Sequence, residues 1–259
     1  MKYINFCSGS KGNCTYIESK QTRLIIDCGS TKRYLSQSLH NWNIQLDTVD
    51  ALLITHDHGD HIAQLRLFDS VQLCLSPVEL NREVVRVMPY VPYRIKDIDV
   101  IPLVLSHDSG LTYGYVLKSD GEKLVYITDT GYLKENNLEY IENADIYIIE
   151  SNHNVDKLMQ SNRPHHTKMR ILSDTGHLSN EDCALILSKV IGPQTKEIVL
   201  AHLSEEANSE TLAYQALTNL IQLDINNIKC AKQHHFTQGG FIHEEQTYDT
   251  LNLSLSRLK

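Results

Sequence analysis

The sequence predicts an α/β (α+β) fold in which two mixed sheets pack together with helices outside. Two observations lead to this class. Short apolar runs typical of strands dominate the first half of the 259-residue chain, whereas helices and strands alternate in the second half. A third observation, the absence of low-complexity linkers and repeats, predicts a single domain over residues 1–259.

The first half contains mostly strands, separated by Gly, Ser and Asn turns. We expect strands at residues 3–6, 14–19, 22–27, 49–55, 71–76, 99–106, 112–119 and 123–129. Helical spacing marks residues 31–42, and a second helix is expected over 77–85 because Pro77 suits a first helical turn.

The second half alternates between the two types of element. Helices are expected at 132–143, 179–191 and 208–222, and strands at 145–151 and 197–202. The helix over 179–191 has the clearest start, because Ser179 is a good N-cap and Asp182 follows three residues later.

Composition narrows the class of protein. Apolar residues make up 41% and charged residues 22% of the chain, which is ordinary for a globular domain. The net charge of −8 argues against broad, nonspecific binding to nucleic acid or anionic membrane. No signal peptide and no membrane-spanning run is visible, and the six cysteines do not have the spacing of a disulfide framework. We therefore expect a cytoplasmic protein that does not bind membranes.

The segment THDHGDH, residues 55–61, follows the apolar run VDALLI directly. Imidazole nitrogens and carboxylate oxygens are common ligands of zinc, iron and manganese. The spacing places His56 and His58 to bind one ion, while Asp60 and His61 can bind a second. Zinc is the default metal, and manganese and iron stay open.

Four further polar residues stand at the carboxyl ends of other apolar runs, where the backbone is rigid: Asp27, His107, Asp129 and His202. Each one alone is more often a turn former or a satisfied polar group. Together with the histidine cluster, they indicate a metal site at one rim of the fold.

The order of LIIDCG, THDHGDH, His107, ITDTG and LAHLS resembles the metallo-β-lactamase superfamily over nearly the whole chain. The resemblance implies a four-layer αββα sandwich with two divalent ions. It further implies that His56, His58, His107 and Asp129 bind one ion, that Asp60, His61, His202 and the bridging Asp129 bind the other, and that Asp27 orients the loop.

Three further stretches, CSGSKGNCTYIES, ESNHNVDKL and RILSDTGHLSNEDCA, resemble the YycJ-like (WalJ-like) branch, which is related to RNase Z and RNase J. This resemblance implies 5′-to-3′ exonuclease activity on DNA, with two ions that activate a bridging water. The segment between Asp129 and His202 is too short for the β-CASP insertion of RNase J.

The catalytic candidates are Asp60, His177 and Glu150. His177 is expected to donate a proton or contact a phosphate, and Glu150 to hold its tautomer as in the related tRNA-processing enzymes. A surface histidine at a helix start is the alternative.

Candidate substrate contacts are Lys168 and Arg170 in RPHHTKMR, and Ser10 and Asn13 in SGSKGN. The first stretch can equally be a solvated loop. The second can cradle a phosphate through backbone amides or form a hairpin turn.

Other functions remain open from the sequence. They are hydrolysis of a small nucleotide, hydrolysis of a thioester or lactone as in glyoxalase II, and a metal-bound scaffold without activity. The sequence does not decide the metal, the polarity of digestion, the choice between DNA and RNA, or the oligomeric state. The roles of His153 and of the pair His234 and His235 are also open, and a third metal site at that pair is unfavoured.

Overall fold

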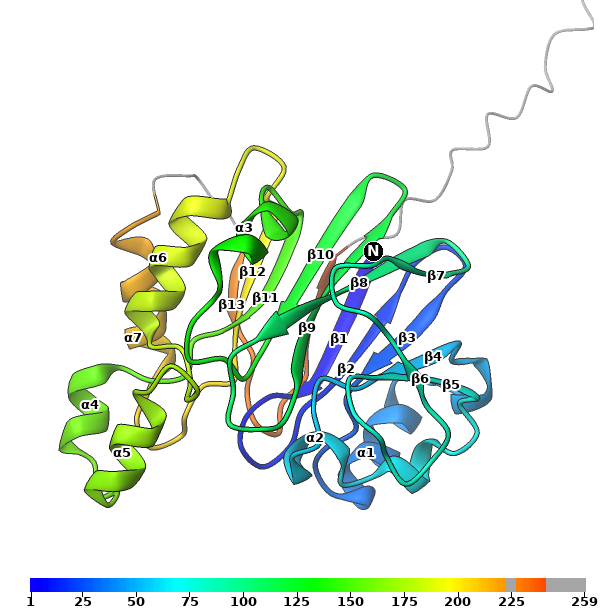
Figure 1. The fold of residues 1–259 in the computed structure, drawn as a ribbon, viewed down its shortest axis with the longest axis horizontal. Helices are drawn as coiled ribbons and strands as arrows, with labels where there is room; N and C mark the ends of the chain where they lie inside the picture. Colours follow the sequence, from blue (N-terminus) through cyan, green and yellow to red (C-terminus); the bar gives the residue numbers. More distant parts are fainter. Residues whose placement is uncertain (222–226, 241–259) are drawn as a thin grey trace, which may run out of the picture.

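The computed structural model describes residues 1–221 and 227–240, which form two seven-stranded sheets lying face to face (Figure 1). The first sheet has the order β14-β1-β2-β3-β4-β5-β6 and the second the order β13-β12-β11-β10-β9-β8-β7. The strands of the first sheet are β1 (Lys2–Cys7), β2 (Cys14–Glu18), β3 (Arg23–Ile26), β4 (Ala51–Leu53), β5 (Leu73–Ser76), β6 (Val85–Arg86) and β14 (Thr237–Gly240). Those of the second are β7 (Tyr93–Ile95), β8 (Ile98–Leu105), β9 (Thr112–Ser119), β10 (Glu122–Ile127), β11 (Ile146–Glu150), β12 (Glu197–Ala201) and β13 (Ile228–Cys230).

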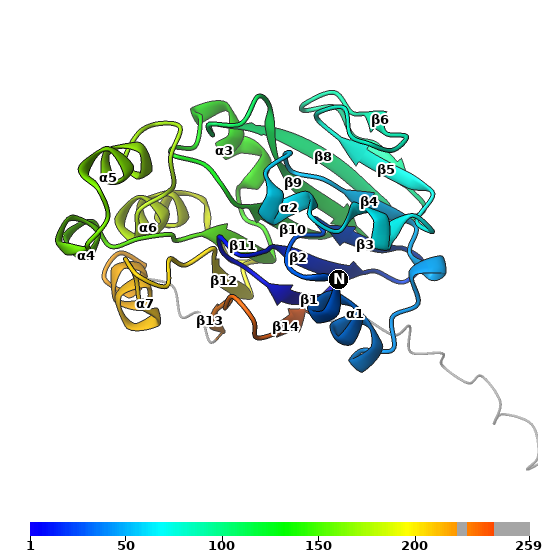
Figure 2. The ribbon, with the colours of Figure 1, turned by 90° about the horizontal axis from the view of Figure 1, so that it is seen from below.

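Helices cover the outer faces of both sheets (Figure 2). The α-helices are α1 (Lys32–Asn41), α2 (Gly59–Ile62), α3 (Glu135–Ile141), α4 (Val155–Gln160), α5 (His165–Ile171), α6 (Asn180–Val190) and α7 (Glu210–Thr218). Helix α1 packs on the first sheet, and α3, α6 and α7 pack on the second. The αββα prediction is therefore confirmed. Within the described residues, no helix has the length and apolarity to cross a membrane.

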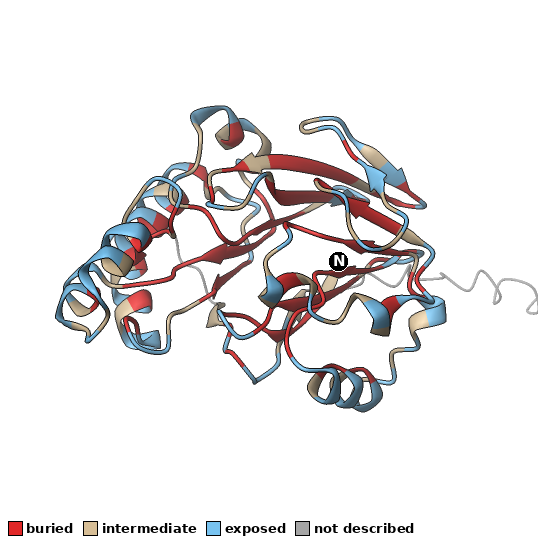
Figure 3. Cartoon of the chain, turned by 60° about the horizontal axis from the view of Figure 1, so that its bottom comes forward, coloured by how far each residue is buried: buried red, intermediate tan, exposed pale blue. Residues whose placement is uncertain are grey.

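The alternation of side chains along each strand explains the layers, because neighbouring residues point to opposite faces of a sheet. On β3, Leu24 and Ile26 face the opposite sheet, whereas Ile25 packs in the cluster that includes α1. Since both faces of the inner strands are covered, β4, β11 and β12 are buried along their whole length (Figure 3). Such burial contributes roughly 2 kcal/mol for each large aliphatic side chain.

The helix predicted over 77–85 is wrong. This segment is irregular, and its last residue begins β6, which pairs in parallel with β5. The Arg82 guanidinium donates to the carbonyl of Phe68 at 3.1 Å and also to that of Val71. These tertiary hydrogen bonds and the sheet edge outweigh a short helical preference that begins only with Pro77.

Other differences concern boundaries and the basic segment. Two short helices, α4 and α5, occupy this region, and the stretch RPHHTKMR lies mostly in α5 rather than in a loop. Helix α7 ends at Thr218, and residue 222 of its predicted span lies outside the described residues. The predicted N-cap is confirmed, because Ser179 Oγ accepts a hydrogen bond from the Asp182 amide at 3.0 Å.

Strand direction brings distant parts of the chain to one edge. Strands β3, β4 and β5 run parallel in the first sheet, and β10, β11 and β12 run parallel in the second. Strand β8 has the direction of β10, because both are antiparallel to β9. The carboxyl ends of β3, β4, β8, β10, β11 and β12 carry or directly precede the predicted metal ligands as well as Asp27 and Glu150.

Candidate metal centre

The loop after β4 carries four of the predicted ligands, and neighbouring segments hold its backbone. The amide of Cys28 donates to the His61 carbonyl at 2.7 Å, and the amide of Asn13 donates to the Asp60 carbonyl at 2.8 Å. A Cβ on Gly29 would lie 1.6 Å from the same Asp60 carbonyl oxygen, so only glycine permits this approach. The loop is therefore packed in place from the side of the first sheet.

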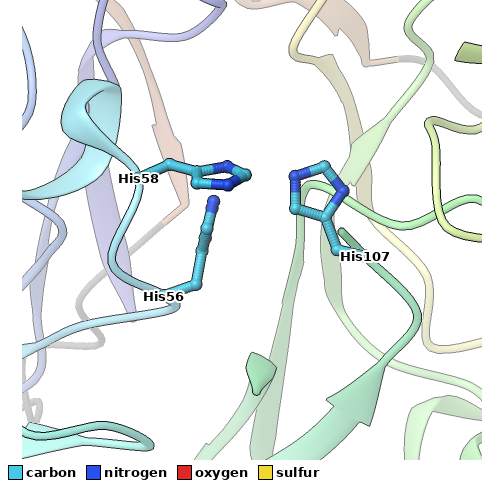
Figure 4. Close-up of side chains that lie close together, drawn as sticks. All are labelled: His56, His58 and His107. Atoms are coloured by element: carbon cyan, nitrogen blue, oxygen red, sulfur yellow. The ribbon is translucent and has the colours of Figure 1, made fainter. Parts of the chain in front are cut away.

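Three imidazoles from the two sheets converge. His56 and His58 lie in the loop between β4 and α2, whereas His107 follows β8 of the second sheet. Their rings face a common space (Figure 4), and one nitrogen from each lies within 4.8 Å of the others. This spacing suits one cation bound by three histidines.

A second group adjoins the first. Ligand atoms of Asp60, His61 and His202 also lie within 4.8 Å of one another. Asp129 stands between the two groups: its Oδ2 is 3.1 Å from His61 Nε2, and its Oδ1 is 3.8 Å from His107 Nε2 and 3.6 Å from His202 Nε2. The structure thus brings all seven predicted ligands together, with the carboxylate expected to bridge at the centre.

Hydrogen bonds on the outer side set the tautomers of three histidines. Their Nδ1 atoms contact the Gly176 carbonyl in His107 (3.1 Å), the Asp27 carboxylate in His61 (2.7 Å) and the Glu150 carboxylate in His202 (2.7 Å). Each Nδ1–H is donated outward, which directs Nε2 toward the centre, the arrangement common among metal-binding histidines. The hydrogen bond between His61 Nδ1 and Asp27 is the contact that the predicted orienting role of Asp27 requires.

Charge at the centre favours a cation. Burial disfavours the charged form of His61, but the carboxylates of Asp27 and Asp129 raise its pKa well above the ordinary value. Burial has the same effect on His202, and Asp129 and Glu150 raise its pKa to about 9. In this buried space the carboxylates stabilise the protonated, positively charged form of the imidazoles. A bound divalent ion would balance the same negative charge.

Two ring nitrogens at the centre have no hydrogen-bond partner among the described residues. Burial lowers the pKa of His56, whose Nε2 is buried and has no hydrogen-bond partner among the described residues. His202 Nε2 is also buried and without a hydrogen-bond partner in the described part of the chain, and a bound ion would take the place of its proton. Buried polar atoms normally have a partner, and imidazole nitrogens aimed beside carboxylates fit a metal ion. The residues present therefore fit divalent metal ions.

The backbone is strained at three of these positions. Asp27 and Asp129 each have φ 60° and His202 has φ 55°, all in the left-handed region that non-glycine residues seldom adopt. Each residue lies just beyond the end of a strand. Strain of roughly 1–3 kcal/mol per residue persists when the surrounding structure enforces it, and it gathers at functional sites.

Glu150 joins the predicted acid to the metal cluster. Its Oε1 accepts hydrogen bonds from His177 Nδ1 at 2.8 Å and from His202 Nδ1 at 2.7 Å. Burial disfavours the carboxylate, yet His177 and His202 lower the pKa of Glu150 to about 2. The contact with His177 was predicted, whereas the contact with His202 was not. The sequence has no local sign of it, because the two histidines approach Glu150 only in the folded sheet.

A cavity of about 240 Å³ opens over the cluster. Its lining combines metal-site residues, His177 and the wall formed by α5. Three polar residues that line or border the cavity were not predicted from the sequence: Asp108, Asn152 and Thr167. Asp108 could have been found, since it follows His107 at a strand end, and Arg163 belongs to the basic stretch already noted.

Of the four predicted substrate residues, two line the cavity and two do not. Ser10 and Arg170 line the cavity. Asn13 is buried, with its Nδ2 2.9 Å from His61 Nε2, and Lys168 donates to the Met159 carbonyl at 2.7 Å outside the cavity lining.

The loop that carries Ser10 and Asn13 has the features of a tight turn. Five of its amides already donate to protein acceptors, which favours the turn over the phosphate cradle: Ser8, Gly9, Lys11, Gly12 and Asn13.

The remaining histidines lie apart from the ligands. His234 and His235 line a separate cavity of about 430 Å³ that shares Leu203 and Ser204 with the first. Among the described residues, these two histidines belong to no metal-binding group. His153 is buried, and burial lowers its pKa to about 4.

Imidazoles and carboxylates gathered at the carboxyl edge of an αββα sandwich define a metal-dependent hydrolase. The family described as the beta-lactamase superfamily domain matches residues 22–203, and the chain belongs to this superfamily.

Two curated relatives match nearly the full chain. The chain is 34% identical over 242 residues to exodeoxyribonuclease WalJ of Streptococcus pneumoniae serotype 2, covering 86% of this chain and 90% of the relative. It is 32% identical over 235 residues to exodeoxyribonuclease YycJ of Bacillus anthracis, covering 83% and 87%. Among solved structures, the metallo-β-lactamase fold protein YhfI from Bacillus subtilis aligns with a TM-score of 0.71 at 16% identity, covering 92% of this chain and 99% of that one. At 16% identity, the similarity to YhfI shows that the two proteins share a fold.

Proposed function

We propose that this protein is a metal-dependent exodeoxyribonuclease that holds two divalent ions, zinc or manganese, and digests DNA from the 5′ end. One observation carries the proposal: Arg163 and Arg170 also line the cavity over the metal cluster. Divalent ions on one side of the cavity and arginines on the other can together bind the negatively charged phosphate of a phosphodiester. The names of the two curated relatives support DNA as the polymer.

The residues of the chain divide the work. Bound divalent ions supply a water of lowered pKa and neutralise charge on the phosphate. Asp60 lines the cavity and can accept a hydrogen bond from the attacking water. His177 also lines the cavity, and its Nδ1–H donates to Glu150 Oε1. The carboxylate stabilises the imidazolium form of His177, whose Nε2–H can then pass its proton to the leaving oxygen.

Further residues orient the reactants. Ser10 and Arg170 contact the substrate in the cavity, while Asn13 acts through His61. Lys168 contacts the DNA backbone outside the cavity. All six cysteines are free, which fits a reducing compartment and supports the cytoplasm as the location.

The experiment is a substrate panel on protein loaded with zinc or manganese. The panel contains 5′-phosphorylated duplex DNA labelled at either end, the matching RNA, a cyclic dinucleotide and a thioester. We expect mononucleotides released progressively from the 5′ end of DNA. Thioester cleavage with intact DNA would contradict the proposal, and release from the 3′ end would contradict its polarity.

A further inference from the structure

Asp108 occupies an unusual place between the metal cluster and the cavity wall. It lies in the turn after β8, next to the expected ligand His107. Its Oδ1 is 3.4 Å from His107 Nε2 and 3.8 Å from His58 Nε2. Its Oδ2 accepts a hydrogen bond from Arg170 Nε at 2.5 Å. One carboxylate therefore connects an arginine of α5 with two histidines of the other wall.

The way in which Arg170 is held leaves part of it free. Asp108 engages only Nε, and within residues 1–221 and 227–240 neither Nη atom of Arg170 has a hydrogen-bond partner. The side chain is 60% exposed and lines the cavity. A guanidinium held by one edge presents its other donors as a planar fork, which matches two oxygens of a phosphate.

Arg163, two residues before α5, is held by two contacts rather than one, because its Nη2 donates to Ser204 Oγ at 3.4 Å. Its Nε donates to Glu206 Oε2 at 2.9 Å, and it also lines the cavity. The difference lies in the anchor. Glu206 is 47% exposed, whereas Asp108 is 27% exposed and lies against the expected ligands. Arg170 is therefore the arginine whose position is tied to the metal cluster.

We propose that Asp108 is a positioning residue that holds Arg170 at the rim of the cavity with its Nη groups free for a substrate phosphate. The inference rests on the proposed phosphodiesterase function and adds a residue to it. A flexible arginine loses side-chain conformational entropy when it binds a phosphate. Asp108 reduces that loss in advance, because Arg170 is ordered before the substrate arrives. Since it engages Nε alone, it does not compete with the phosphate for the fork.

The test compares Arg170→Gln, Asp108→Asn and the double variant with Lys189→Gln, which removes an exposed charge from α6. Four quantities are measured. They are kcat and KM on 5′-phosphorylated duplex DNA, metal content of the loaded protein by plasma mass spectrometry, and the anisotropy of fluorescein-labelled duplex with metal-stripped protein across a salt series. Anisotropy and metal content need no turnover.

We expect Arg170→Gln to raise KM roughly tenfold with a smaller change in kcat, the size of one charge-assisted hydrogen-bonding contact. The slope of log affinity against log salt should fall by about 1. Asp108→Asn should raise KM by roughly threefold or more without loss of metal. The double variant should match Arg170→Gln, because both residues act through one guanidinium. Lys189→Gln should match the wild type.

Three outcomes would overturn the inference. A fall in metal content for Asp108→Asn would make Asp108 part of the metal site. Tighter DNA binding by Asp108→Asn would mean that the carboxylate screens Arg170. Multiplicative effects in the double variant would separate the two residues. If the wild type leaves DNA intact but hydrolyses the p-nitrophenyl ester of thymidine 5′-monophosphate, the proposed function fails, and the same variants on that ester still decide the role of Asp108.

Discussion

The two sides of the cavity are built differently. The metal cluster lies at strand ends, and its central residues are buried: His56, His61, Asp129 and His202. Hydrogen bonds hold its side chains, and the surrounding structure enforces strained backbone at Asp129 and His202. The opposite wall consists of the short helix α5 and the residues just before it, and its arginines, Arg163 and Arg170, are partly exposed and each paired with one carboxylate. The helix lies at the same end of the molecule as α2 (Figure 1). The contrast distinguishes donors fixed at buried strand ends from exposed arginines whose positions depend on carboxylate partners.

The largest effect is expected at the centre of the rigid side. Asp129→Ala should lower kcat/KM by roughly 10³-fold or more, since it removes the shared carboxylate of both ion positions. Metal content of the purified protein should fall with activity. A variant that keeps both its metal and its activity would show that Asp129 does not join the two positions.

The next effect separates chemistry from metal binding within the same cluster. His177→Ala should lower kcat by roughly 10²–10⁴-fold, because the leaving oxygen loses its proton donor, while metal content stays at the wild-type level. Glu150→Gln is the matched variant. It should reduce both activity and metal affinity, since Glu150 also orients His202. Loss of metal in His177→Ala would remove the acid assignment.

The buried carboxylate of Glu150 also predicts a pH dependence of stability. Its pKa is lowered in the fold from 4.5 to about 2, so the stability it provides is complete above pH 4.5 and is lost as the pH falls toward 2. In metal-free protein, the difference in Tm between the wild type and Glu150→Gln should therefore shrink as the pH falls through this window. A difference that stays constant from pH 6 to pH 2 would contradict the assignment.

The smallest effect is expected on the helical wall. Arg163→Gln should raise KM severalfold and reduce the salt dependence of DNA binding by about one counterion, with kcat and metal content nearly unchanged. The free energy of unfolding should change by less than about 1 kcal/mol, because the ion pair between Arg163 and Glu206 is exposed. A fall in kcat as large as that of His177→Ala would erase the distinction between the two walls.

Local sequence was sufficient for the metal side. Apolar runs that end in His or Asp predicted both the strands and the edge where their ends meet, since parallel strands place their carboxyl ends together. The ligand set therefore followed from spacing and resemblance, and the structure brings its members together. That residues 1–259 form one domain stays a prediction, because residues 222–226 and 241–259 lie outside the described structure.

The other wall and the links between elements required the folded chain. The stretch around Lys168 and Arg170 carries charge but little apolar periodicity, so its helix and the different directions of these two side chains come from packing. The double contact of Glu150 and the contact between Asp108 and Arg170 join residues at least 27 positions apart. Amino-acid order alone thus determined which chemical groups stand at the strand ends, because that depends on neighbours in the chain. Which groups touch across the cavity was decided only by the tertiary structure, because those contacts depend on how separate elements pack.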